Sequence, residues 1–167
     1  MRMFLGLLSL AFLLHSCEKK GNDKVPRLEF REIKPDYLTK AFLDNLNEGT
    51  KANASKLFLT LKDEDGDLGY LPGKDTSLVY LSFFTDSGDS SRLDSLLFPD
   101  LRLASGKIMN VDLVVNLYNT LGGICGLAGQ DSMVQVYYLA YVKDFAGNKS
   151  NVINTKELEA PLICSCK

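Results

Sequence analysis

Residues 132–144, "SMVQVYYLAYVKD", carry the clearest structural signal in the chain. Apolar side chains recur there at every second position, with polar or aromatic residues between them. This period of two is typical of a strand that buries one face and leaves the other toward solvent. We therefore expect a half-buried strand of an antiparallel sheet, whose inner face carries Val134, Val136, Tyr138, Ala140 and Val142.

The same alternation recurs along the chain. In "KIMNVDLVVNLY", residues 107–118, every second residue from Val111 to Leu117 is again apolar. Clusters rich in Gly, Asp and Ser separate these stretches and predict turns between strands. About seven such strands predict a single all-β, antiparallel sandwich. The remaining strand candidates are 27–33, 56–62, 77–85, 98–104 and 151–158.

One stretch, "PDYLTKAFLDNLNEG" at 35–49, departs from this pattern. Its apolar residues recur at helical spacing, Asp36 could cap a helix, and Gly49 could end it. We expect one short helix near 37–47, or an irregular crossing strand in its place.

Two motifs resemble known envelope proteins. The segment "VYYLAYVKDFAGNKSNV" resembles the last hairpin of bacterial immunoglobulin-like domains, and "LFLTLKDEDGDLG" resembles an acidic strand end of small Bacteroidota lipoproteins that contain such domains. The resemblance implies an immunoglobulin-like fold in a lipid-anchored envelope protein. Gly147 and Asn148 fit a hairpin independently, because both residue types tolerate the positive φ of tight turns.

The N-terminal stretch "MRMFLGLLSLAFLLHSC" has the features of an export signal. Arg2 supplies a positive start, and the apolar run that follows is shorter than the roughly 20 residues of a membrane-spanning helix. Its end, "LLHSC", resembles the lipobox of bacterial lipoproteins, which implies acylation of Cys17. The alternative is an ordinary secretory signal with an incidental cysteine.

These features predict a domain organisation and a location. We expect a signal peptide over 1–16, a flexible polar tether over 17–25 and one domain over 26–167. Acyl chains on Cys17 would hold the domain at the cell envelope, most simply at the outer membrane, with the periplasmic or surface face left open.

Charge and histidine content exclude several functions. With 19 Lys and Arg against 21 Asp and Glu, the chain has no basic excess for nucleic-acid binding. Its one histidine, His15, lies in the expected signal peptide, so histidine-dependent nucleophile systems and zinc sites are not expected in the mature protein. We expect a protein that is not an enzyme, the alternative being a carboxylate-based hydrolase.

The stretch "DEDGDLG", residues 63–69, is the best candidate for a binding site. In consecutive antiparallel strands, the loops after 56–62 and after 132–144 meet at the end where the domain begins. Several carboxylates at one place repel one another unless a cation neutralises them, and calcium prefers oxygen ligands. The alternative is a solvated turn, and the loop is not an EF-hand, since Leu68 stands where that motif has glycine. The candidate calcium ligands are Asp63, Asp65, Asp67 and Asp144.

Three cysteines lie beyond Cys17. Cys125 precedes the strand at 132–144, and Cys164 and Cys166 follow the last predicted strand, so all three should lie at the end opposite the acidic loop. Export favours a disulfide from Cys125 to either Cys164 or Cys166.

Aromatic residues suggest a binding role. Five lie near loops or on outward strand positions: Tyr70, Tyr80, Phe84, Tyr137 and Tyr141. The family resemblance implies that such a surface could contact a glycan or an envelope protein. We expect a lipid-anchored binding or structural module that calcium stabilises, the alternative being a glycan-binding accessory lipoprotein of a polysaccharide-uptake system.

Overall fold

The computed structural model describes residues 25–69, 77–86, 94–97, 108–127 and 133–167. The expected signal peptide, Cys17, most of the tether, Tyr70 and the expected strand at 98–104 lie outside these ranges. Within them, no helix is both long and apolar enough to cross a membrane.

The first sheet has three antiparallel strands in the order β1-β3-β6. Arg27 of β1 pairs with Lys62 of β3, so the start of the domain lies beside the end of that strand. Asp63, the last residue of β3, pairs with Met109 at the start of β6. The strands are β1 (Arg27–Lys34), β3 (Lys56–Asp63) and β6 (Met109–Asn116).

The second sheet has the order β2-β9-β7-β4-β5, and β8 also pairs with β7. All its pairings are antiparallel except that of β2 with β9. Its strands are β2 (Tyr37–Leu38), β4 (Leu78–Thr85), β5 (Asp94–Leu97), β7 (Met133–Lys143), β8 (Ile153–Asn154) and β9 (Leu162–Ser165).

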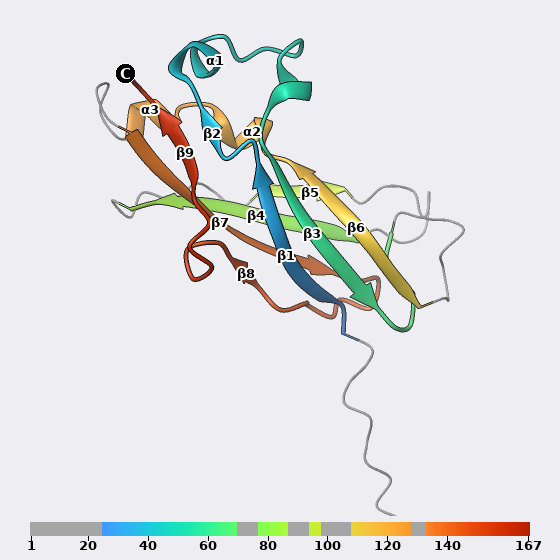
Figure 1. Ribbon diagram of the computed structural model, residues 1–167. Coiled ribbons are helices and arrows are strands. Elements are labelled where there is room, and N and C mark those ends of the chain that lie inside the picture. The colour runs from blue at the N-terminus through green and yellow to red at the C-terminus, as the bar shows by residue number, and fades with distance from the viewer. Residues whose placement is uncertain (1–24, 70–76, 87–93, 98–107, 128–132) are drawn as a thin grey trace, which may run out of the picture.

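The two sheets pack face to face, and their strands cross in Figure 1. The first sheet contains the first, second and fifth strands of an immunoglobulin-like domain, which are β1, β3 and β6, and the facing sheet contains β4, β5 and β7. This is the strand order of an immunoglobulin-like sandwich. The alternating apolar residues form the core, where Leu57, Leu59 and Leu61 of β3 face Val136 and Tyr138 of β7, all at 0% exposure. The predicted fold class is confirmed.

The last strand differs from the prediction. A continuous strand at 151–158 is wrong: β8 covers only Ile153–Asn154, and a turn in which Glu159 has a φ of 52° separates it from β9. Thr155 fixes the break, because its backbone N–H donates to Tyr138 O and its hydroxyl accepts from Tyr138 N. The chain leaves β7 opposite Leu139 and rejoins the same edge opposite Val136, three residues closer to the start of that strand.

The stretch at 35–49 contains both predicted alternatives in succession. Residues 37–38 form β2, and α1 (Lys40–Asp44) follows. Asp36 does not cap the helix, because α1 begins only at Lys40 and Thr39 is its N-cap; the backbone carbonyl of Asp36 accepts from Ile163 N of β9. The helix ends at Asn45, before Gly49. Three further short helices connect strands: η1 (Lys51–Asn53), α2 (Tyr118–Leu121) and α3 (Ile124–Leu127).

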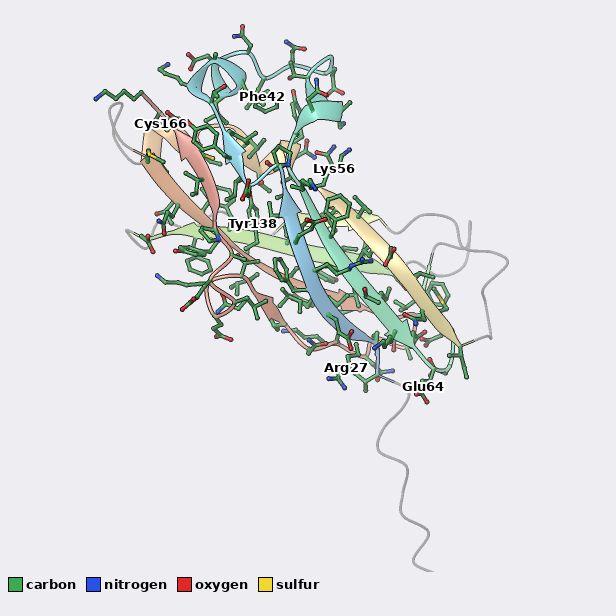
Figure 2. All side chains as sticks on the ribbon, viewed as in Figure 1. Arg27, Phe42, Lys56, Glu64, Tyr138 and Cys166 are labelled. Carbon is green, nitrogen blue, oxygen red and sulfur yellow. A yellow bond between two sulfur atoms is a disulfide. The ribbon has the colours of Figure 1, made fainter. Side chains whose placement is uncertain are left out.

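The two ends of the sandwich differ in chemistry. Figure 2 shows Arg27 and Glu64 together at one end, where the N-terminal segment enters the domain. Cys166 and Phe42 lie at the other. The acidic loop and the cysteines therefore occupy opposite ends, as the strand count predicts.

Candidate metal centre

The acidic loop is held at both ends. It leaves β3 at Asp63 and is closed by two hydrogen bonds, from Ser77 N to Gly69 O at 2.8 Å and from Gly69 N to the Ser77 hydroxyl at 3.2 Å. Gly66 has a φ of 67°, in the left-handed region that favours glycine, and this turn brings Asp67 back toward Asp63. Leu68 is 1% exposed and packs in the core. Leu68, which stands where an EF-hand has glycine, therefore anchors the loop to the core.

Three carboxylates converge inside this loop. Asp63, Asp65 and Asp67 each offer one oxygen, and these oxygens lie within 4.8 Å of one another. Asp63 is only 1% exposed, and its Oδ2 accepts from Asp67 N at 3.1 Å. The Oδ1 atoms of all three residues are buried and have no hydrogen-bond partner among the residues that the structure describes. A buried carboxylate oxygen without a partner is costly, and no described residue places a positive or donating group at the centre of this loop.

The electrostatics of the cluster agree with this geometry. Burial, and after it the charges of Asp65 and Asp67, together raise the pKa of Asp63 to about 7. Burial also raises the pKa of Asp67 to about 6, with Asp144 and Asp65 adding repulsion. Crowded carboxylates thus disfavour their own ionised forms, which is the opposite of what a salt-bridged surface loop shows.

Asp144 comes from the second predicted loop and lies beside this cluster. The adjoining residue, Phe145, donates its backbone N–H to Asp67 O at 3.0 Å, which joins the two loops. Both carboxylate oxygens of Asp144 accept from Asn148, one from its backbone N–H and one from its side-chain amide, each at 2.7 Å. Asp144 therefore closes the hairpin after β7 and adds negative charge, whereas the other three aspartates form the compact oxygen group.

The oxygen group suits a hard cation. Calcium binds oxygen at about 2.3–2.6 Å, so ligands on opposite sides of one ion are roughly 5 Å apart, which accommodates a cluster within 4.8 Å. Glu64 is exposed and is not part of the group. The three carboxylates would supply the anionic ligands, and carbonyls or solvent would complete a coordination number of about 6–8.

The predicted hydrolytic use of these carboxylates requires an apolar cleft beside one of them. Two cavities within the described part of the chain are lined by other residues, one along β6 and α2 and one between β1 and β9. Neither cavity gives a substrate access to the acidic loop.

The cysteines occupy the opposite end. Cys125 of α3 and Cys166 form a disulfide with an Sγ–Sγ distance of 2.03 Å, which assigns the partner that the sequence left open. Cys164 is a free, buried thiol, and burial raises its pKa to about 12. The alternative bridge to Cys164 does not form, although both cysteines are fully buried.

Four of the five predicted aromatic residues gather on the outer face of the second sheet. Tyr80 of β4 stacks on Tyr141 of β7 with ring centroids 4.7 Å apart, and Phe84 stacks on Tyr137 at 5.6 Å. The alternation of β4 and β7 predicts that these rings share one face. It does not predict the lysines that lie over the rings, which are Lys143, Lys149 and Lys156.

A comparison of the chain with protein-family models, with curated proteins and with solved structures finds no match. The oxygen cluster therefore carries the functional argument by itself.

Proposed function

We propose that this protein is a lipid-anchored envelope module whose immunoglobulin-like domain binds one calcium ion through Asp63, Asp65 and Asp67. The observation that supports the ion most directly is the set of three buried Oδ1 atoms, one from each aspartate, that find no hydrogen-bond partner within the described ranges. The ion is structural: it would neutralise the cluster and perform no chemistry.

The location of the cluster supports this role. Arg27 pairs with Lys62, one residue before Asp63, so the acidic loop adjoins the point where the chain enters the domain. The bond from Phe145 N to Asp67 O joins the loop to the hairpin after β7, which belongs to the other sheet. An ion at this point would link the two sheets at the N-terminal end of the sandwich. This is the end on which a membrane tether at Cys17 would pull.

Calcium binding can be tested by thermal unfolding and titration calorimetry of residues 18–167, with calcium, magnesium or EDTA. At a concentration about 100 times Kd, calcium should add about 2.7 kcal/mol to the free energy of unfolding, equivalent to a rise of roughly 8 °C in Tm. Magnesium should have a smaller effect, because it requires a tighter octahedral site. Equal midpoints in calcium and EDTA would reject the ion.

The anchor requires its own test. Full-length protein expressed in a Gram-negative host should incorporate labelled palmitate and fractionate with membranes. Cys17→Ser should abolish both, whereas Cys164→Ala, which changes a buried thiol in the domain, should leave both intact. Unlabelled wild-type protein in the soluble fraction would contradict lipidation.

A further inference from the structure

A groove of about 410 Å³ lies between β1 and β9, where one side of the sandwich is open (Figure 1). One wall is β1, with the apolar residues Phe30 and Ile33, and the opposite wall includes Pro161, just before β9. Ile33 is 7% exposed and Phe30 packs against the core, so this wall continues the hydrophobic interior. The crossing from β1 to β2 closes one end, because Asp36 O accepts from Ile163 N at 2.8 Å.

The backbone edge of β1 beside this groove is open. Leu28, nearer the start of the strand, donates its N–H to Asn151 Oδ1 at 2.8 Å and accepts from Asn151 Nδ2 at 2.9 Å, so both its backbone groups point away from β3. Backbone groups alternate in direction along an antiparallel strand, so the N–H and C=O of Phe30 point the same way. Among the described residues, no group from outside the sheet bonds to them. The edge is therefore occupied at Leu28 and free at Phe30.

The rim of the groove is acidic. Glu32, Asp36 and Glu159 line it and are exposed, and none of the three forms an ion pair with a residue in the described ranges. Arg31 also lines the groove, but its guanidinium is paired with Asp112 at 2.9 Å. Three uncompensated carboxylates around one groove favour a cationic ligand.

We propose that this groove binds an extended peptide of alternating apolar and basic residues, which adds as a strand to the free edge of β1. The open backbone edge selects an extended chain, and the apolar wall selects apolar side chains at every second position. The acidic rim selects lysine or arginine between them. The span from Phe30 to Asp36 is at most roughly 20 Å at about 3.3 Å per residue, which fits a peptide of about five residues.

The same features disfavour three other partners. Two copies of this chain paired edge to edge through β1 would bring their acidic rims together, and the repulsion opposes such a dimer. An anionic membrane surface is repelled for the same reason. A polyamine would neutralise the rim, but it would leave the N–H and C=O of Phe30 unpaired and the apolar wall uncovered.

Calorimetry of residues 18–167 with the acetylated, amidated peptide KVKVK tests binding, in EDTA so that the result is independent of the proposed calcium site. The double variant Glu32→Gln and Glu159→Gln should weaken binding about tenfold, since two exposed ion pairs are lost. The control double variant Glu48→Gln and Glu64→Gln removes the same charge elsewhere and should bind as wild type does. The peptide EVEVE should not bind, and neither should KPKPK, because proline cannot donate to a strand ladder.

Hydrogen exchange of single backbone amides, followed by NMR, tests the strand addition itself. Saturating KVKVK should slow the exchange of the Phe30 N–H at least tenfold and leave that of Leu28, which is already bonded to Asn151, unchanged.

Several results would overturn the proposal. These are no binding of KVKVK by folded wild-type protein, an equal loss in the two double variants, equal binding of KPKPK or of spermine, and unchanged exchange at Phe30 in the complex. Thermal unfolding of each variant in EDTA would verify that it is folded before binding is measured.

Discussion

Replacing Asp63 by Asn should change the stability of the domain in opposite directions with and without calcium. The substitution keeps the size of the side chain and an oxygen that can accept from Asp67 N, but removes one buried negative charge. In EDTA at pH 8 the charge repels its neighbours, so the variant should be more stable than wild type. In calcium the same charge is a ligand, so the variant should lose most of the stabilisation.

The magnitude follows from the pKa of Asp63, which is raised from 3.8 to about 7. One pKa unit corresponds to about 1.4 kcal/mol, so the full shift sets an upper limit of roughly 4 kcal/mol. Solvent reaches the half-buried Asp65 and Asp67 and screens this repulsion, so we expect a gain of about 2 kcal/mol in EDTA. If the substitution weakens calcium binding about 100-fold, a concentration that stabilises wild type by about 2.7 kcal/mol stabilises the variant by only about 0.4 kcal/mol.

The assay is urea unfolding of both proteins at pH 8, in EDTA and in calcium. The matched control is Glu64→Gln, which removes an exposed charge from the same loop and should change neither midpoint appreciably. The reasoning is refuted if Asp63→Asn destabilises the domain equally in EDTA and calcium. The carboxylate would then act only as a hydrogen-bond acceptor for Asp67 N.

Four further predictions concern the acidic cluster, the disulfide, the free thiol and a buried tyrosine. In EDTA, protonated Asp63 and Asp67 should stabilise the domain fully below about pH 4, and this stabilisation should be lost as the pH rises through 6 to 7, because both folded-state pKa values exceed the unfolded value. Urea midpoints at several pH values measure this decline. A stability that rises over this interval would contradict the prediction. Cys125→Ser removes a disulfide that closes a sequence separation of 41 residues and should lower the free energy of unfolding by about 4 kcal/mol through loop entropy. The free thiol of Cys164 should resist labelling by a thiol reagent at pH 8 until the domain unfolds. Tyr138→Phe removes the buried hydroxyl contact to Thr120 at 3.1 Å and should cost about 1 kcal/mol in urea unfolding, with an unchanged midpoint arguing against that bond.

The sequence predicts the sandwich well because alternation is a local signal. In β3 and β7 each apolar residue at the expected position is buried, and a one-residue slip would expose all of them. Antiparallel counting then places the loop after β3 beside the hairpin after β7, as the bond from Phe145 N to Asp67 O shows. This placement needs no knowledge of side-chain contacts.

Features that depend on single tertiary hydrogen bonds were not predictable in the same way. Thr155 breaks the last strand through its bonds to Tyr138, and the backbone of Asp36 bonds to Ile163 before the helix begins. Asp144 resembles the other acidic residues in sequence, yet Asn148 occupies both its oxygens. The choice of Cys166 over Cys164 could not be predicted, because alternation does not distinguish residues two apart and both side chains are fully buried.

The most direct measurement is the anomalous diffraction of a crystal of the domain grown with calcium. A peak should lie about 2.3–2.6 Å from Oδ1 of Asp63, Asp65 and Asp67, and should be absent from crystals of Asp63→Asn. Clear density for the three side chains with no peak between them, at millimolar calcium, would contradict the account.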